Sequence, residues 1–295
     1  MNLPKCASAI VREYWEKGRS DSCPIIDLHG HFGVLSVSYL PVAPAEKMLP
    51  ALRRAGVRTI VCSAHEALFG NYARGNQEMQ SAVDQYPDLL RGYWVVNPNH
   101  DDSWRRAPDD FQSTRGFAGF KFLPDYHTYP LEGDHYQPAL EYANAHQLLA
   151  LVHTWGGSAF NSPRQVETVA VKYPAAVFLM GHSGYGDWET SVRVAASLPN
   201  VYLDLTAVYS AHDFSMFPTG SGTPLPLLSC LQVNGIIEYM VMKASSKKMV
   251  FGTDMPWYSP HYAAGAVLLA RIDDEARHDI LHRNAERLLT RGQRT

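Results

Sequence analysis

The sequence predicts an α/β fold, a (β/α)8 TIM barrel, regular or distorted, with a short N-terminal helical extension. The first observation is that short apolar or β-branched runs recur eight times and alternate with helix-like segments. The second is that most runs are almost continuously apolar, which is typical of parallel strands covered by helices. The third is size, because eight such units in about 250 residues match this barrel.

The eight runs are predicted to be the strands of the barrel. In order, they are 24–31, 58–64, 91–98, 116–124, 148–155, 176–184, 200–207 and 248–256. The helix-like segments between them include 45–56, 78–87, 136–147, 162–174 and 231–245, and several end at Gly or Pro, as helices often do. An open doubly wound sheet shares this alternation, but no G-x-G-x-x-G follows the first strand, which disfavours a dinucleotide-binding version. We therefore predict one barrel domain over 1–295.

Composition excludes several classes of function. The net charge is −3, which gives no electrostatic basis for binding nucleic acid or an anionic membrane. No apolar run approaches the roughly 20 residues that span a bilayer, and the N-terminus lacks the apolar core of a signal peptide. The four cysteines are scattered without C-x-x-C spacing. We expect a cytoplasmic protein that binds a small molecule, with no nucleic-acid or membrane partner; homo-oligomer formation is left open.

Polar side chains fall at the ends of the predicted strands. Because the carboxyl ends of barrel strands converge on one mouth, these side chains should meet in space. His29 and His31, at i and i+2, share one face of their strand, as two ligands of one ion require. Imidazoles with a carboxylate favour Zn2+, with Mn2+ or Fe2+ as alternatives, and one or two ions. The residues are His29, His31, Lys121, His153, His182 and Asp254.

This pattern resembles the amidohydrolase superfamily, specifically its amidohydrolase 2 branch of metal-dependent hydrolases and decarboxylases. The resemblance rests on D-x-H-x-H at 27–31 and on segments 75–98, 119–124, 181–184, 251–256 and 280–289. It implies that His29, His31, His153 and Asp254 hold a catalytic metal. It also implies that His182 is either a ligand of a second metal or an acid/base beside the bound water. Asp27 would be structural or would orient a ligand imidazole.

Lys121 has two interpretations. In two-metal members of the family, a lysine on strand four is carbamylated and bridges the ions, and Lys121 has the matching place in order. Otherwise it is an ordinary lysine, paired with Asp125 or with a substrate carboxylate. Asp254 is predicted to accept a proton from water and deliver it to the leaving group, with His182 as the second catalytic candidate.

Substrate contacts are expected on the loops that line the mouth of the barrel. Each candidate could instead be an ordinary packing, solvated or surface residue. Arg74 is either a clamp that binds a substrate carboxylate through its guanidinium or a surface arginine. The candidates are His65, Arg74, Asp125, His127, Trp155, Tyr185, Trp257 and Tyr258. The loop 208–226 is a further candidate, as a lid or a structural excursion.

Three functions are compatible with these residues. The leading one is a metal-dependent hydrolase that cleaves a C–N or C–O bond of an amide, lactone or related ester, with a carboxylated aromatic or cyclic compound as substrate. The alternative is a non-oxidative decarboxylase of the same family, because the ligand set does not separate the two reactions. A non-catalytic metal-binding barrel with a regulatory or binding role is the third.

Overall fold

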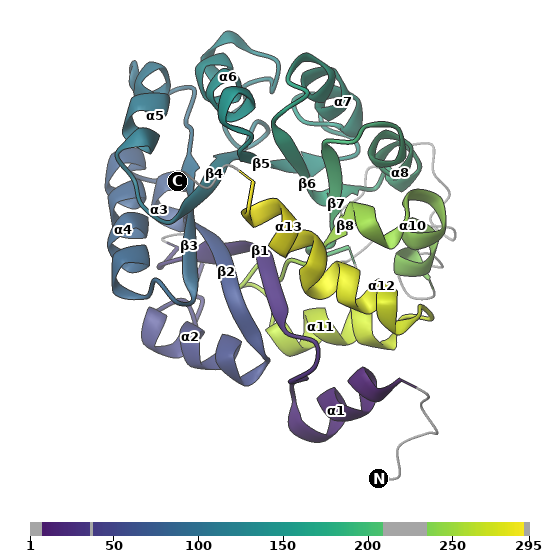
Figure 1. Cartoon of the computed structure of the whole chain (residues 1–295). Helices are drawn as coiled ribbons and strands as arrows, with labels where there is room; N and C mark the ends of the chain where they lie inside the picture. The colour runs from purple at the N-terminus through teal and green to yellow at the C-terminus, as the bar shows by residue number, and fades with distance from the viewer. Residues whose placement is uncertain (1–7, 36–37, 209–234, 292–295) are drawn as a thin grey trace.

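The computed structural model describes residues 8–35, 38–208 and 235–291, and in these ranges the chain forms the predicted TIM barrel (Figure 1). Each strand pairs in parallel with the next, in the order β1 to β8. The strands are β1 (Ile25–Phe32), β2 (Val57–Ala64), β3 (Leu90–Val95), β4 (Phe117–Phe122), β5 (Leu149–Trp155), β6 (Val177–Tyr185), β7 (Val201–Asp204) and β8 (Met249–Val250). All eight predicted strands are confirmed, although β8 is much shorter than the run 248–256.

The barrel is closed by backbone hydrogen bonds between β1 and the segment that follows β8. The Leu28 amide donates to the Phe251 carbonyl over 2.9 Å, and the Asp254 amide donates to the His29 carbonyl over 2.8 Å. The chain after Val250 therefore still pairs with β1 although its backbone is irregular. This pairing sets Asp254 directly beside the end of β1.

Helices form the outer ring around the strands (Figure 1). The main ones are α1 (Ala9–Lys17), α2 (Ala45–Arg54), α3 (His65–Phe69), α4 (Tyr72–Gln85), α5 (Ser103–Gln112), α6 (Gln137–His146), α7 (Pro163–Lys172), α8 (Trp188–Ser197), α10 (Ile236–Ala244), α11 (Pro260–Leu269), α12 (Asp274–His278) and α13 (Asn284–Leu289). Short turns η1 (Asp134–Tyr136), η3 (Ser246–Lys248) and η4 (Asp279–Arg283) join them, and η4 is a π-helical segment.

Local sequence explains where several helices begin and end. Ser8 caps the first helix through its side chain, and Gly18 ends it in a left-handed conformation. This helix, α1, is the predicted N-terminal extension. Ser162 and Gln165 form a capping box at the start of α7. Helices α5, α8 and α11 were not among the predicted segments, and the predicted helix 231–245 is described only from residue 235 onward.

The barrel interior is a packed apolar core. One cluster inside the strands includes Leu28, Tyr93, Leu151 and Leu179, all essentially inaccessible to solvent. Residues of α13 contact this cluster from below, and α13 lies across that end of the barrel in Figure 1. The second cluster fills the layer between strands and helices. No helix in the described ranges is long and apolar enough to cross a membrane.

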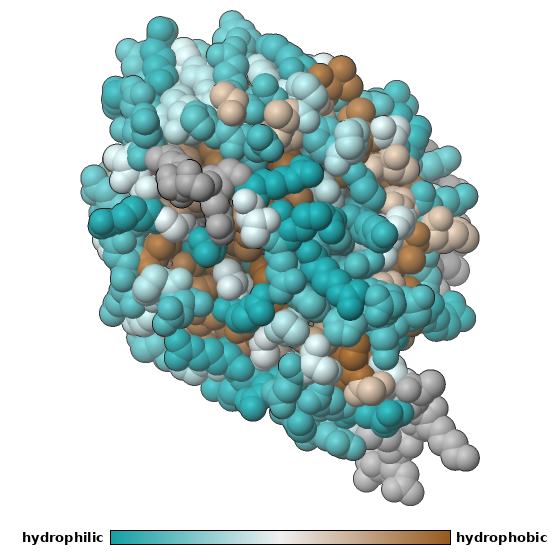
Figure 2. Space-filling view, viewed as in Figure 1, coloured by the Kyte–Doolittle hydropathy of each residue, from teal (hydrophilic) through white to brown (hydrophobic). Residues whose placement is uncertain are grey.

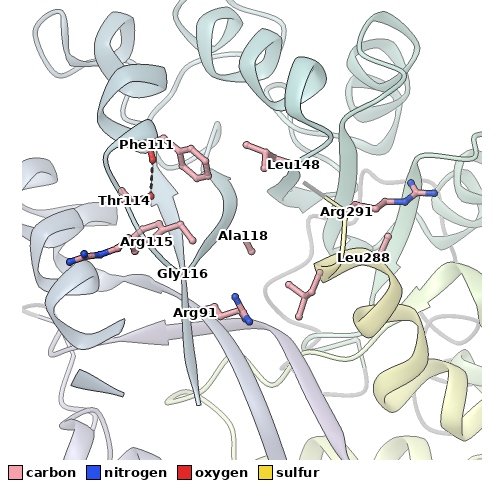
Figure 3. Close-up of a pocket in the computed structure, with 11 residues that line it drawn as sticks. Arg91, Phe111, Thr114, Arg115, Gly116, Ala118, Leu148, Leu288 and Arg291 are labelled. Atoms are coloured by element: carbon pink, nitrogen blue, oxygen red, sulfur yellow. Dashed lines mark hydrogen bonds between the residues drawn. The ribbon is translucent and has the colours of Figure 1, made fainter. Parts of the chain in front are cut away.

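A cavity of about 470 Å³ opens at the amino ends of the strands, between β3, β4 and α13 (Figure 3). The face at this end is mainly hydrophilic, with apolar side chains visible in a hollow (Figure 2). Arg91, Arg115 and Arg291 stand around an apolar wall that includes Phe111 and Leu288. Its lining contains none of the predicted ligands, so this cavity is separate from the candidate site at the carboxyl ends.

Candidate metal centre and substrate pocket

The first group of candidate ligands comprises His29 and His31 from the end of β1 and Asp254 from the segment after β8. Nε2 of His31 lies 2.9 Å from Oδ1 of Asp254, and Nε2 of His29 lies 3.7 Å from the same oxygen. One ligand atom from each residue lies within 4.8 Å of the others. Two imidazole nitrogens and a carboxylate at these separations can bind one divalent transition-metal ion.

Hydrogen bonds orient both imidazoles. Nδ1 of His29 donates to Oδ2 of Asp204 over 2.5 Å, so Nε2 is the atom left for a metal. The other oxygen of Asp204 accepts hydrogen bonds from the backbone amide and the hydroxyl of Thr206. Nδ1 of His31 lies 3.1 Å from the hydroxyl of Ser63. A carboxylate behind a ligand imidazole is the usual arrangement at metal sites, because it holds the tautomer and raises the basicity of the ligand.

Asp27 has a structural position. Its Oδ1 accepts hydrogen bonds from the backbone amides of His29 and Thr253, and its Oδ2 accepts one from the Thr253 hydroxyl. Asp27 therefore links β1 to the segment after β8, and the partner of the His29 ring is Asp204. Complete burial raises the pKa of Asp27 to about 8.

Lys121 lies among the candidate ligands and is completely buried. Its Nζ is 3.0 Å from Nε2 of His29. Burial is the main reason why the pKa of Lys121 falls to about 8. Asp125, its predicted alternative partner, approaches His153 instead, with Oδ2 3.6 Å from Nε2 of that ring.

His153 and His182 form a second pair of imidazoles in the same pocket. Nδ1 of His153 lies 3.1 Å from Nε2 of His182, and Nδ1 of His182 donates to the Thr206 carbonyl over 3.2 Å. Burial lowers the pKa of both rings, that of His182 to about 4. The rings are therefore neutral, with nitrogen lone pairs available to a metal. His153 is not part of the compact group of His29, His31 and Asp254.

The backbone at two of these residues has an unusual conformation. His182 and Asp254 both have a φ of 60°, and Ser183 has a φ of 50°. Residues with side chains seldom adopt this left-handed region, and it commonly costs about 1–3 kcal/mol. Such strain is concentrated at functional sites, where it aims a side chain that ordinary strand geometry would direct elsewhere.

The candidate ligands open into a cavity of about 210 Å³ at the mouth of the barrel. Of the predicted substrate residues, His65, Trp155, Trp257 and Tyr258 line it. The His65 ring stacks on His31, and its Nδ1 donates to the Gly33 carbonyl over 2.8 Å. Burial lowers the pKa of His65 to about 4, so this ring is neutral as well. The lining that the sequence did not indicate consists of Leu68, Phe69, Leu123, Tyr126 and Ala207.

The structure places four other predicted residues away from the cavity wall. Tyr185 is buried behind Trp155 and stacks on it, and Asp125 lies behind His153. His127 is held by the Leu68 carbonyl and the Tyr136 hydroxyl.

Arg74 is 64% exposed and pairs with Glu66, so its guanidinium is not brought to the mouth of the barrel. The loop 208–226 lies outside the described residues beyond Val208.

Sequence reasoning missed Asp204 and Ser63, which support the two imidazoles of β1. Asp204 had one available signal, because it is the only charged residue in the mostly apolar run 200–207. Ser63 had none, because a serine near a strand end is too common to stand out.

The chain resembles known proteins in both sequence and fold. The sequence profile of a family described as Amidohydrolase matches residues 26–291. No curated protein sequence matches the chain. Many solved structures share the fold, and the three described below are 16% identical or less.

Three of these structures illustrate the likeness. An uncharacterised TIM-barrel protein from Bordetella bronchiseptica has a TM-score of 0.69 at 16% identity, over 92% of this chain and 100% of the other. A 2,6-dihydroxybenzoate decarboxylase from Rhizobium has a TM-score of 0.63 at 14% identity, over 90% and 98%. A 5-carboxyvanillate decarboxylase from Novosphingobium aromaticivorans, complexed with manganese and a nitrobenzoic acid, has a TM-score of 0.66 at 12% identity, over 90% and 96%. These likenesses establish the shared fold.

Proposed function

This chain belongs to the amidohydrolase family, and from that premise we propose that it is a metal-dependent hydrolase that cleaves a C–N or C–O bond of a small molecule. The donor atoms fit a divalent transition-metal ion, because the Asp204 hydrogen bond occupies Nδ1 of His29, and Nε2 lies on the side of His31 and Asp254. Neutral imidazoles and a carboxylate favour Zn2+, with Mn2+ and Fe2+ as alternatives.

The main support for hydrolysis is the position of Lys121. Its Nζ lies 3.0 Å from the nitrogen that His29 offers to a metal, where a permanently charged ammonium would oppose a bound cation. Burial, which lowers its pKa to about 8, increases the fraction of neutral amine. A neutral amine can add to CO2 and release one proton, which converts Lys121 into an N-carboxylate anion. Carbamylation therefore replaces a repulsive cation with two oxygen ligands.

A carbamylated Lys121 would stand between two sets of ligands. His29, His31 and Asp254 form the first set, and the neutral pair His153 and His182 forms the second. Two-metal members of the family combine such sets through a bridging lysine carbamate. We therefore favour two ions and assign His182 to the second.

In the reaction, Asp254 would act as the proton carrier. Burial is the largest single influence and opposes its ionisation, but the hydrogen bond with His31 and the surrounding imidazoles together outweigh burial and hold the pKa of Asp254 well below its usual range. A bound ion supplies Lewis acidity, which activates water and polarises the carbonyl under attack. Asp254 accepts the proton of the attacking water and passes it to the leaving nitrogen or oxygen as the C–N or C–O bond breaks.

The pocket favours a small ring as substrate. Its volume of about 210 Å³ is below the range of about 300–1,000 Å³ that is usual for drug-sized ligands. Trp155, Tyr126 and Trp257 supply flat apolar walls. We propose a monocyclic compound, aromatic or lactone-like, with a carboxylate as a plausible substituent.

A second candidate function is non-oxidative decarboxylation of an aromatic acid. Two of the proteins of similar fold described above are decarboxylases, one of 2,6-dihydroxybenzoate and one of 5-carboxyvanillate, and this likeness favours the second candidate. In this reaction Lys121 would remain an ammonium that attracts the substrate carboxylate. The C–C bond breaks, CO2 leaves, and the ring carbon retains the electron pair and takes up a proton from the site.

One set of experiments tests both candidates. The protein, reconstituted with Zn2+, Mn2+ or Fe2+, is assayed against lactones, aryl amides and hydroxybenzoates, with separate detection of hydrolysis products and CO2. Hydrolysis predicts two metal ions at the mouth of the barrel and a CO2-sized mass increase at Lys121 in native mass spectrometry. The Lys121→Ala variant should lose activity and regain part of it when short carboxylic acids are added. Release of CO2 without hydrolysis, together with one ion at the mouth of the barrel and an unmodified Lys121, would instead establish the decarboxylase.

A further inference from the structure

We propose that Cys23, His278 and His282 form a second transition-metal site, independent of the proposed reaction and located at the opposite end of the barrel. Nδ1 of His278 lies 2.9 Å from Nε2 of His282. One ring nitrogen of each histidine and the sulfur of Cys23 all lie within 4.8 Å of one another. The three donors come from both ends of the chain and meet only in the folded barrel.

The site joins the start of β1 to the C-terminal helices. Cys23 precedes β1, and the candidate ligand His29 lies six residues further on, about 20 Å away along an extended strand. His278 ends α12, and His282 lies in the π-helical segment η4 that leads into α13. The spacing H-x3-H falls within the range used by zinc-binding histidines, and π-helical segments occur frequently at functional sites.

The cations near the Cys23 thiol are engaged by carboxylates. Cys23 is only 2% exposed, so a thiolate at this position would be shielded from water. Two nearby cations are already paired: Arg277 with Asp274 over 2.9 Å, and Arg283 with Glu275 over 2.6 Å. A divalent ion would supply the charge that stabilises the Cys23 thiolate, because metal binding deprotonates a coordinating thiol.

The ring of His282 is oriented as in a metal ligand. Its side chain is only 12% exposed, and Nδ1 lies 3.3 Å from Oε1 of Glu286 without a well-aligned hydrogen bond. Nε2, the opposite nitrogen, faces His278. A carboxylate behind the far nitrogen of a histidine is the common support for a metal-bound imidazole. A hydrogen bond between the two histidines alone would explain their contact but would assign no role to Cys23.

The donor set selects the class of ion. A thiolate and two imidazoles are soft or borderline ligands, which favour Zn2+ over Ca2+ or Mg2+. With three protein ligands, water would complete a tetrahedral shell. The ion would fasten the amino end of β1 to the helices that close the bottom of the barrel, so its contribution would be to stability.

Cobalt absorption distinguishes this site from the centre at the barrel mouth. Titration of the metal-free, full-length protein with Co2+ in a thiol-free reductant should produce a near-ultraviolet sulfur-to-cobalt charge-transfer band. His29, His31 and Asp254 contain no sulfur and cannot produce it. We expect the band to saturate at one thiolate-bound ion per chain and to disappear when Zn2+ is added.

Variants assign the band to its residues. It should vanish in Cys23→Ser and persist in a control in which Cys6, Cys62 and Cys230 are all replaced by serine. Cys62 makes this control well matched, because it is also buried in the barrel. Absence of the band in the wild type, or its survival in Cys23→Ser, would overturn the proposal.

A second variant keeps the thiol. The double substitution His278→Gln and His282→Gln should weaken Co2+ binding at this site at least tenfold, whether or not Cys23→Ser folds. An affinity equal to that of the wild type in the double variant would also overturn the proposal. Hydrolytic or decarboxylase activity is not needed for either measurement.

Discussion

Asp204→Asn tests the role of the carboxylate behind His29. The substitution keeps the shape of the side chain and removes its charge. In the native protein, Oδ2 of Asp204 accepts the Nδ1 proton of His29 over 2.5 Å, and both residues are completely buried. An asparagine can still accept this hydrogen bond through its amide oxygen, although its amide nitrogen cannot accept the hydrogen bonds from Thr206, and it no longer raises the basicity of Nε2.

The expected effect is a loss of metal affinity. Removal of such a supporting carboxylate typically weakens binding about 10–100-fold, or about 1.4–2.7 kcal/mol. The effect should be toward the upper end of this range, because the low-polarity surroundings screen the lost charge only weakly.

Competition with a chromophoric chelator would measure the dissociation constant of Zn2+ for the metal-free wild type and the variant. Asp187→Asn is a matched control: Asp187 caps α8 through its side chain and does not contact the candidate ligands. Urea unfolding of both metal-free variants separates metal affinity from folding. A dissociation constant for Asp204→Asn within twofold of the wild type, in a folded protein, would refute the assignment of this role.

Four further outcomes are expected. Thr253→Val removes the hydroxyl that donates to buried Asp27, and urea denaturation should show a loss of about 1–3 kcal/mol in the free energy of unfolding. Leu179→Ala leaves a void inside the barrel and should cost about 2–5 kcal/mol in the same assay, whereas an unchanged midpoint would contradict the packed interior. Metal removal should lower the melting temperature, since an ion present at a thousandfold excess over its dissociation constant adds about 4 kcal/mol. Trp257→Ala opens the pocket wall and should raise KM more than it lowers kcat; an equal loss in both would argue for a role in the reaction itself.

The fold and the main ligands could be predicted from the sequence, because both depend on local patterns. Apolar runs alternating with helical segments specify parallel strands, and parallel strands in a barrel carry their carboxyl ends to one mouth. The spacing of His29 and His31 then places both on one strand face. The barrel topology alone then brings the polar residues near the other strand ends to the same mouth.

The finer arrangement of the site depends on contacts between remote segments. The pairing of His29 with Asp204, the contact between His153 and His182, and the burial of Lys121 follow from how the strands are staggered. No composition or period encodes these contacts. The backbone conformation of the site could not be predicted either, because the left-handed φ of Asp254 is uncommon for aspartate and no sequence pattern indicates it.

Cys23, His278 and His282 illustrate the same limit more strongly. In the sequence, Cys23 is an isolated thiol without a metal-binding spacing, and the two histidines lie near the other end of the chain. They meet because the helices after β8 return to the start of β1 and close the bottom of the barrel. Local patterns specify which elements form, whereas a site assembled from both ends of a chain exists only after those elements have packed.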